Sequence, residues 1–186
     1  MHFIVALKAE ARPLLRHFGM ARSPGADSMP IYTSARARLT ISGVGEPASR
    51  AAVQAATDAG RPVAFLNVGI AGHRDLEPGS PVMIHKVTSA RDGSVHYPAF
   101  PFCPPCRTDS LITVAEPELD YPESSAYDME GSAYFAAAAA ASGSELSHAV
   151  KVISDNPRHP TTALSAHAVE ALVDAHLPLL DGLAVT

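Results

Sequence analysis

Two carboxylates flank a methionine directly ahead of a segment that is almost pure alanine. They are Asp128 and Glu130, near the start of the stretch YDMEGSAYFAAAAAASG, from Tyr127 to Gly143. Alanine is the best helix former, so the stretch predicts a buried helix. Negative charge in the first turn of a helix is favoured by the helix dipole by about 0.3–1 kcal/mol. An ionised carboxylate also accepts hydrogen bonds, so a ligand-binding role for this pair stands beside the helix-stabilising one.

A third carboxylate closes an apolar strand. Asp155 lies in the segment KVISDNP, from Lys151 to Pro157. Asp, Asn and Pro are common turn residues, so one interpretation is a simple turn. The other is a carboxylate that faces a cleft at the carboxyl end of the strand, where α/β proteins bind their ligands.

Two other motifs have the spacing of known sites but lack the expected context. GVGEPA, from Gly43 to Ala48, matches the glycine pattern of a dinucleotide site, yet the next strand ends in Asn67 and not in an acidic residue. This glycine loop then indicates a close backbone approach to some ligand, or a tight turn. Cys103 and Cys106 have the spacing of a redox pair or of half a zinc site, but they lie between prolines in a predicted loop. Surface thiols are the simpler interpretation, and a thiol or zinc module is the alternative.

The chain has 186 residues and a net charge of −5 at neutral pH. This length suits one domain, and we expect residues 1–186 to form it. Nucleic-acid binding needs clustered positive charge, and the sequence has no run of Lys and Arg. The first apolar run is too short for a signal peptide or a membrane span. We therefore expect a cytoplasmic protein that binds a small molecule, with neither a nucleic-acid nor a membrane partner.

Apolar segments rich in β-branched residues recur along the chain and predict strands, and helical patterns lie between or after several of them. This alternation predicts an α/β fold with a mixed, mostly parallel sheet that helices cover on both faces. Ligands are then expected at the carboxyl ends of the strands. The expected strands are 2–7, 39–44, 63–70, 80–87, 110–115 and 148–155, and the expected helices are 9–18, 47–60, 129–143 and 161–180.

The order of five motifs in this chain resembles the purine nucleoside phosphorylase and nucleosidase superfamily. ALKAE follows the first strand, SGVG precedes a helix, NVGIAG ends the third strand with EPGSPV after it, DMEG opens a helix and VISD closes a strand. The pattern is most similar to the nucleosidase branch, which cleaves methylthioadenosine and S-adenosylhomocysteine. The resemblance implies a nucleoside phosphorylase-like domain that cleaves the N-glycosidic bond of a purine nucleoside, of the adenine type with a modified 5′ position.

The resemblance also implies roles for particular residues. In the family, the Met-Glu pair at this helix start holds the ribose hydroxyls, and here the pair is Met129 and Glu130. The aspartate that protonates N7 of the purine corresponds to Asp155, with Ser154 placed to orient it. The glutamate that activates water in the hydrolytic branch corresponds to Glu10. One carboxylic acid then assists the leaving base while another carboxylate prepares the nucleophile.

An ionised carboxylate accepts hydrogen bonds from two ribose hydroxyls, so Glu130 is expected to bind sugar while Asp128 serves the helix dipole. Gly45, Gly69 and Gly72 are consistent with a close backbone approach to the ligand. They complete the substrate-binding residues implied by the resemblance, together with Ile70 and Lys151.

Three positions depart from the family pattern. Phosphorylases carry an arginine at the position of Asn67 and a serine at that of Ile70, and Lys151 stands where an arginine is expected. Without those donors a phosphate dianion is poorly bound, so we expect hydrolysis by water. Phosphorolysis, with phosphate as a second ligand, and a catalytically silent nucleoside-binding protein are the alternatives.

Further expectations follow from the resemblance. It implies no metal or organic cofactor, and a homodimer or a higher homo-oligomer, as members of the family form. The proline-rich region from Arg91 to Glu123 lacks the stretch in which relatives place base-stacking and flap residues. The base and the 5′ substituent are therefore not defined by the sequence.

Overall fold

The computed structural model describes residues 1–24, 29–58, 64–160 and 164–185. The strands are β1 (His2–Val5), β2 (Ala21–Arg22), β3 (Ile31–Thr33), β4 (Arg38–Ile41), β5 (Phe65–His73), β6 (Pro81–Ser89), β7 (Val95–His96), β8 (Thr108–Thr113), β9 (Ala126–Asp128) and β10 (Ser147–Asp155). The helices are α1 (Lys8–Phe18), α2 (Glu46–Asp58), α3 (Gly131–Ser142), the short 3-10 helix η1 (Ser144–Leu146), α4 (Ala166–Asp174) and α5 (Leu177–Val185).

All the strands belong to one mixed sheet. β1 runs parallel to β4 and β5, and β5 runs parallel to β10. β6 pairs antiparallel with β10 and parallel with β8, and β9 then pairs parallel with β8 and antiparallel with β5. These pairings close β5, β10, β6, β8 and β9 into a ring, while β1, β4, β3 and β2 extend from β5 as an open sheet. The predicted mixed, mostly parallel sheet is confirmed, with the closed ring as an addition.

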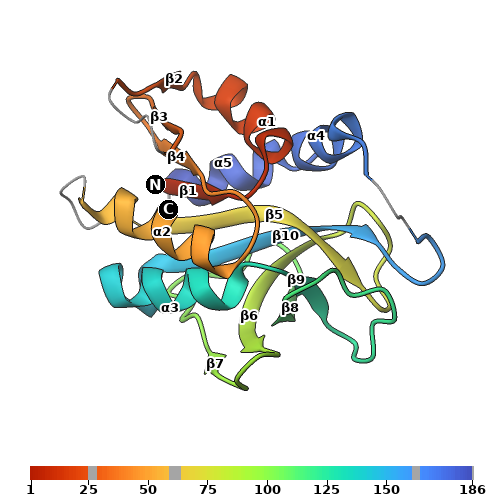
Figure 1. The fold of residues 1–186 in the computed structure, drawn as a ribbon. Coiled ribbons are helices and arrows are strands. Elements are labelled where there is room, and N and C mark those ends of the chain that lie inside the picture. Colours follow the sequence, from red (N-terminus) through yellow and green to blue (C-terminus); the bar gives the residue numbers. More distant parts are fainter. Residues whose placement is uncertain (25–28, 59–63, 161–163, 186) are drawn as a thin grey trace.

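Helices cover both faces of this sheet (Figure 1). α2 and α3 pack on one face, and α1, α4 and α5 on the other. The side chains of β1 show why, because Phe3 contributes to the core under α1 and its neighbour Ile4 to the core under α2 and α3. Successive residues of a strand point to opposite faces, so a strand that is apolar throughout needs cover on both.

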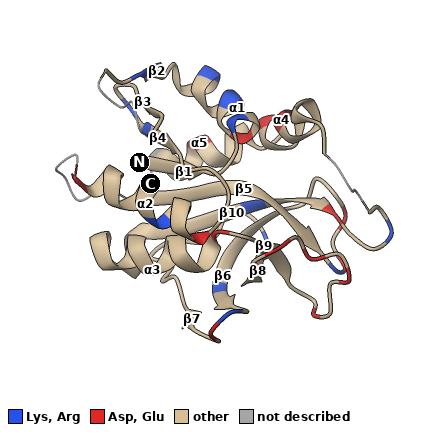
Figure 2. Cartoon of the chain, viewed as in Figure 1, with Lys and Arg blue, Asp and Glu red and all other residues tan. Residues whose placement is uncertain are grey.

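Oppositely charged segments of α1 and α4 lie next to one another on the outside of the molecule, coloured blue and red in Figure 2. Arg12 lies 2.5 Å from Glu170, and Arg16 lies 3.2 Å from Asp174. The arginine side chains are more than half exposed, and exposed pairs of this kind contribute about 0–1 kcal/mol each. The apolar core beneath the two helices therefore dominates their packing.

All the predicted strands are present, but four short ones escaped prediction. β2, β3, β7 and β9 have only two or three residues each, which is too short for an alternating pattern to be recognised. Two of them define the shape of the sheet, since β3 extends it beyond β4 and β9 closes the ring.

The single helix predicted over residues 161–180 is wrong, because the structure has two helices there. α4 begins after Ser165, whose side chain accepts a hydrogen bond from the Ala168 amide at 3.1 Å, and residues 161–163 lie outside the described residues. The chain turns at His176, whose Nε2 lies 2.7 Å from the Gly79 carbonyl oxygen. α5 then starts with Pro178 as its second residue, and proline favours the first turn of a helix.

The other predicted helices are confirmed with small shifts. α3 begins at Gly131, two residues later than expected, and the last two residues of the range 47–60 lie outside the described residues. Among the described residues, no helix combines the length and the apolar character needed to cross a membrane.

The parallel pairing of β1, β5 and β10 brings their carboxyl ends to the same edge of the sheet. Leu7 follows β1, Ile70 lies in the second half of β5, and Asp155 ends β10. The candidate site residues, far apart in the sequence, therefore lie around one end of the sheet.

His2 gives the fold a pH dependence. Burial, with a contribution from the charge of Arg38, lowers the pKa of His2 from 6.5 to about 4. The unfolded chain binds a proton at His2 more readily than the folded protein does, so stability is full above pH 6.5 and is lost as the pH falls toward 4. By linkage this loss amounts to roughly 2 kcal/mol between pH 8 and pH 5.

Urea unfolding at both pH values should show that the stability of His2→Gln depends less on pH than that of the wild type. The exposed His167 provides the control, His167→Gln, which should keep the full dependence, and a His2→Gln variant that also keeps it would contradict the prediction.

Candidate active site

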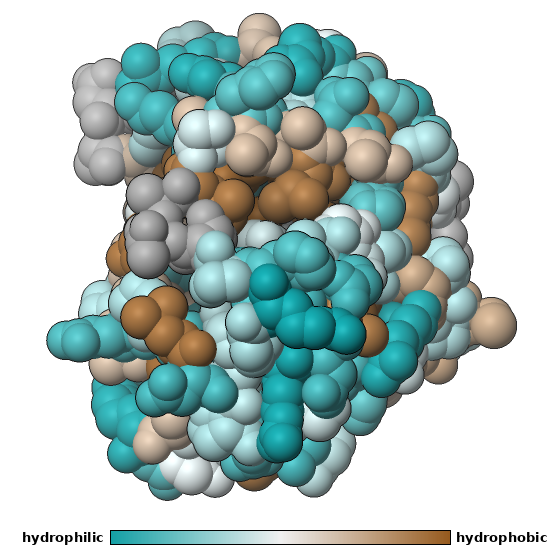
Figure 3. Space-filling model, turned by 90° about the vertical axis from the view of Figure 1, so that its right-hand side faces the viewer, coloured by the Kyte–Doolittle hydropathy of each residue, from teal (hydrophilic) through white to brown (hydrophobic). Residues whose placement is uncertain are grey.

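A cavity of about 310 Å³ lies at this end of the sheet. Figure 3, which views the molecule from this side, shows apolar side chains gathered in a hollow with hydrophilic surroundings. The loop after β1, the carboxyl halves of β5 and β10, and the segment from β8 to α3 form its walls. The residues predicted from the sequence that line it are Glu10, Ile70, Gly72, Met129, Glu130, Ser154 and Asp155. The remaining three do not line it: Gly45 and Lys151 bond to the lining residues Glu130 and Asp128, and Gly69 leaves space for Glu10.

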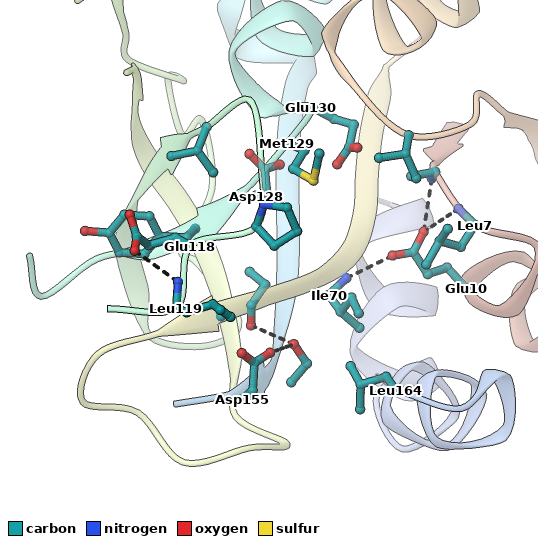
Figure 4. A pocket seen from close by; sticks show the side chains of 18 of the residues that line it. Leu7, Glu10, Ile70, Glu118, Leu119, Asp128, Met129, Glu130, Asp155 and Leu164 are labelled. Atoms are coloured by element: carbon teal, nitrogen blue, oxygen red, sulfur yellow. Dashed lines mark hydrogen bonds between the residues drawn. The ribbon is translucent and has the colours of Figure 1, made fainter. Parts of the chain in front are cut away.

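Glu10 is held on one side of the cavity by backbone amides. Its Oε2 accepts hydrogen bonds from the amides of Ala6 and Leu7 at 3.0 and 2.8 Å, and its Oε1 accepts one from the Ile70 amide at 3.0 Å (Figure 4). The bond from Leu7 arises because Glu10 is the third residue of α1, where a glutamate reaches back to the start of its helix. The side chain is therefore fixed between β1 and β5.

Burial raises the pKa of Glu10 to about 6, although the amides and the charge of Lys151 partly oppose this effect. The residue is only 2% exposed. A carboxylate with a pKa near neutrality is suited to accept a proton during a reaction. Gly69 makes room for it, because a Cβ at that position would lie 2.9 Å from Glu10 Oε1. The space left by this glycine is thus filled by the protein's own side chain.

Asp128 and Lys151 form a buried ion pair that the sequence did not indicate. Lys151 Nζ lies 2.8 Å from Asp128 Oδ2, and the two side chains are 2% and 1% exposed. Asp128 also accepts hydrogen bonds from Thr113 Oγ1 at 2.9 Å and from the Gly131 amide at 2.9 Å. Asp128 therefore stabilises the start of α3 as expected, but it does so from the end of β9 and with a lysine as its partner.

The charge of Lys151 is maintained by carboxylates. Burial lowers the pKa of an ammonium group, but Asp128, Glu130 and Glu10 together raise the pKa of Lys151 above its usual value. Because Lys151 contacts Asp128 from behind the cavity lining, it lies where it can compensate the negative charge of the site.

Glu130 and Met129 lie on the side of the cavity formed by the start of α3, and Figure 4 shows both beside Asp128. Glu130 occupies the position directly before α3 instead of its first turn, and its side chain makes no capping hydrogen bond to the helix. Its Oε1 accepts a hydrogen bond from the Gly45 amide at 2.7 Å. Gly45 has a φ of +97°, which glycine adopts without the steric cost that other residues pay. Burial and the charge of Asp128 raise the pKa of Glu130.

Asp155 lies across the cavity from Glu130, at the end of β10 (Figure 4). Ser154 Oγ donates a hydrogen bond to Asp155 Oδ1 and lies 3.2 Å from the Ala71 carbonyl oxygen. Tyr121 donates a hydrogen bond from its hydroxyl to Asp155 Oδ2. Sequence reasoning missed Tyr121, since it lies in the proline-rich segment without periodicity.

Two of the three positions that depart from the family pattern, Asn67 and Ile70, offer no donor to an anion in the cavity. The Asn67 side chain donates a hydrogen bond to the Ile4 carbonyl oxygen at 3.0 Å and is 2% exposed. Ile70 contributes an apolar side chain to the cavity wall. Among the described residues that line the cavity, none is a lysine or an arginine.

The two cysteines lie apart from this cavity. Cys103 is exposed and Cys106 is half-buried against the apolar core, and both are free thiols. Burial raises the pKa of the Cys106 thiol, which disfavours the reactive thiolate. Within the described ranges, no group of three or more His, Cys, Asp and Glu side chains is placed to hold a metal ion.

The buried ion pair leads to a stability prediction. Lys151→Met leaves Asp128 charged and buried without its partner, which typically costs about 3–5 kcal/mol. Urea unfolding should show this loss, whereas Lys8→Met, at an exposed lysine, should be close to wild type. Adding Asp128→Asn to Lys151→Met should recover part of the loss because it removes the uncompensated charge. Wild-type stability of Lys151→Met would show that the pair does not form.

No protein-family model matches the sequence, and no curated protein matches it either. Solved structures do match. An Arabidopsis thaliana 5′-methylthioadenosine nucleosidase superposes with a TM-score of 0.83 at 16% identity, covering 98% of this chain and 93% of that chain. A Helicobacter pylori 5′-methylthioadenosine/S-adenosylhomocysteine nucleosidase has a TM-score of 0.74 at 13% identity, with 99% and 97% covered. A Chlamydia trachomatis nucleosidase bound to methylthioadenosine has a TM-score of 0.72 at 18% identity, with 97% of both chains covered. The chain therefore has the nucleoside phosphorylase-like α/β fold of these nucleosidases.

Proposed function

We propose that residues 1–186 act as one domain that hydrolyses the N-glycosidic bond of a purine nucleoside. One observation carries the proposal: two carboxyl groups line one cavity from different elements, Glu10 from α1 and Asp155 from the end of β10, and Met129 and Glu130 line a third side of it (Figure 4). This is the arrangement needed to prepare a nucleophile on one side of a sugar and to protonate a leaving group on the other. The similarity in fold to nucleosidases supports the same reaction class.

The proposed step uses each of these groups once. Glu10 accepts a proton from water, and the water oxygen bonds to C1′ of the ribose as the bond from C1′ to N9 breaks. The electron pair of that bond passes to the purine, and the Asp155 carboxyl group donates its proton to N7. Glu130 accepts hydrogen bonds from the ribose hydroxyls while Met129 packs against the sugar.

Hydrolysis is favoured over phosphorolysis by the charge of the site. Lys151 is already paired with Asp128, and the Asn67 amide is directed to Ile4. A phosphate dianion would therefore meet carboxylates without the cationic donors that it needs. Water has no such requirement.

The apolar lining of the cavity favours a nucleoside with an apolar 5′ substituent, and the solved relatives lead us to propose adenine as its base. The apolar side chains of Leu7, Val44, Leu119 and Leu164 line the cavity, and Val44 and Leu119 are 53% and 64% exposed. Solvent-exposed apolar side chains at the mouth of a cavity are suited to contact an apolar ligand group. The solved relatives include one bound to methylthioadenosine.

We also propose that the protein acts in the cytoplasm as a homodimer or higher homo-oligomer. The two free thiols of Cys103 and Cys106 support the location, because a reducing compartment keeps cysteines in this form. The assembly is supported by the family resemblance and by exposed apolar side chains outside the cavity, Val95 and Tyr97, which an interface could cover. Size-exclusion chromatography with light scattering would measure the mass of the assembly.

The proposed activity is tested by incubating the protein with adenosine, inosine, methylthioadenosine, S-adenosylhomocysteine and 5′-deoxyadenosine, with and without phosphate. Chromatography should show free base and free sugar in amounts that do not depend on phosphate. Sugar 1-phosphate would indicate phosphorolysis. Thermal stabilisation by an unchanged nucleoside would indicate a silent binding protein, because ligands that bind the native state raise its stability.

Asp155→Asn should reduce turnover at least about 100-fold, because the amide cannot donate the proton that the leaving base needs. Nucleoside affinity, measured by calorimetry, should change little because the side chain keeps its shape. Asp92→Asn, at an exposed aspartate of the turn between β6 and β7, serves as the matched control. Near-normal turnover by Asp155→Asn would exclude Asp155 as the proton donor.

Protonation of Glu10 should make turnover fall at acidic pH, which appears as an acid limb in the pH profile of the rate. The carboxylate must be ionised to accept a proton, and its pKa is about 6, so turnover should rise with pH through that value. Glu10→Gln should abolish most of this turnover by removing the base, whereas Glu145→Gln, at an exposed glutamate of η1, should retain both the rate and the limb. A rate independent of pH between 5 and 7 would argue against Glu10 as the base.

A further inference from the structure

Tyr121 lies in the segment between β8 and β9 and is 3% exposed. Its hydroxyl donates a hydrogen bond to Asp155 Oδ2, while Ser154 donates to Asp155 Oδ1. Both oxygens of the proposed proton donor therefore have a hydroxyl group as a partner in the free protein. The contact spans 34 positions of the sequence, so only the tertiary fold creates it.

The protein makes specific room for the Tyr121 ring. A Cβ at Gly72 would lie 2.5 Å from both Cε1 and the hydroxyl oxygen of Tyr121. On another side the ring makes an edge-on contact with Tyr127, with 5.6 Å between the ring centroids. Gly72, predicted to allow a close approach of ligand, thus allows a close approach of this tyrosine.

The backbone at Tyr121 is held in an unfavourable conformation. Its φ is +45°, the one positive φ of a residue other than glycine in the described part of the chain. Such a conformation persists only where the surroundings determine it. The next residue supplies one restraint, because Arg74 donates a hydrogen bond to the Pro122 carbonyl oxygen at 2.8 Å. The hydroxyl contact with Asp155 supplies another.

The hydroxyl remains a donor over the working pH range. Burial, together with the hydrogen bond to Asp155 and the charge of that carboxylate, raises the pKa of Tyr121 well above its ordinary value. A hydroxyl group binds an ionised carboxylate more strongly than a neutral carboxylic acid. Its interaction with Asp155 therefore strengthens as the carboxyl group loses its proton.

We propose that Tyr121 is a positioning residue that acts through Asp155, orienting its carboxyl group and stabilising the carboxylate formed when the proton passes to the leaving base. The proposal rests on the proposed function. In the step, the Asp155 O–H bond breaks and an N7–H bond forms, while the electron pair of the glycosidic bond passes to the purine. The Tyr121 O–H bond stays intact throughout. An interaction that is stronger in the transition state than in the ground state accelerates the step.

The hydrogen bond from Tyr121 also has an effect that opposes proton donation. A hydroxyl donor favours the ionised form of a carboxyl group over its protonated form. Removing the Tyr121 hydroxyl should therefore slow the step at its pH optimum and extend activity to higher pH. A residue with a merely structural role would change neither pH limb.

Other charged groups around Asp155 must be considered in such a titration. Glu118, from the same segment as Tyr121, acts on the Tyr121 hydroxyl through its charge. Glu10 and Glu130 line the same cavity from α1 and from the start of α3. Arg158 and His159 follow β10, and both pair with Glu77. Single substitutions at Tyr121 leave all of these groups in place.

The test compares Tyr121→Phe with Tyr134→Phe. Tyr134 is also a buried tyrosine whose hydroxyl donates a hydrogen bond, to the His148 carbonyl oxygen at 2.8 Å, but it does not line the cavity. The measurements are the pH dependence of kcat and kcat/KM, and the titration of aspartate carboxyl carbons by NMR with Asp155→Asn for assignment.

Tyr121→Phe should lower the maximal kcat about 10-fold. It should also move the alkaline limb of the rate profile and the Asp155 titration midpoint upward by about one pH unit, as expected for loss of one hydrogen bond to a charged group. Tyr134→Phe should change neither.

Gly72→Ala provides a second variant, because its methyl group displaces the Tyr121 ring without removing the hydroxyl. It should shift the Asp155 midpoint in the same direction as Tyr121→Phe. The inference is overturned if the wild type is active while both variants keep its alkaline limb and its Asp155 midpoint. Failure of the proposed function looks different, since the wild type itself would then release no base, and the positioning role of Tyr121 would fall with it.

Discussion

The ion pair between Lys151 and Asp128 lies where β10, β9 and the start of α3 meet, and both side chains are almost fully buried. Glu10 and Glu130 place two further carboxyl groups within reach of the same ammonium group. Burial of several carboxylates is costly unless a cation and hydrogen bonds compensate them. Lys151 supplies that cation from behind the cavity, so carboxyl groups can line the cavity itself. The raised pKa of Glu10 follows from the same balance, because burial outweighs the compensation that one lysine provides.

The sheet determines where the carboxyl groups and the lysine that compensates them come together. The parallel strands β1, β5 and β10 end at one edge, and the loop after β1 and the carboxyl halves of β5 and β10 each contribute to the wall of the cavity. The glycines of β5 then serve the protein's own side chains: Gly69 leaves room for Glu10, and Gly72 leaves room for Tyr121. A glycine-rich strand in this position is therefore explained by the packing of functional side chains before any ligand is considered.

The segment between β8 and β9 contributes what the family resemblance does not supply. It lacks helices and strands of its own, yet it carries Tyr121 into contact with Asp155 and Leu119 to the mouth of the cavity. Connecting segments that are placed on a rigid sheet often carry specificity, because they vary without disturbing the core. The proposed influence of Tyr121 on the proton donor comes from a connecting segment of this kind.

The strand and helix patterns of the sequence determined the α/β class, the strands of the central sheet and the presence of Glu10, Glu130 and Asp155 at the ends of elements, because periodicity and end signals are local properties. Short strands, the break between α4 and α5 at His176, and the closure of the ring by β9 needed the structure, since each depends on pairing between distant segments. The same holds for the contacts of Lys151 with Asp128 and of Tyr121 with Asp155. A side chain's partner across the fold is decided by tertiary packing, and neither residue type nor spacing along the chain records it.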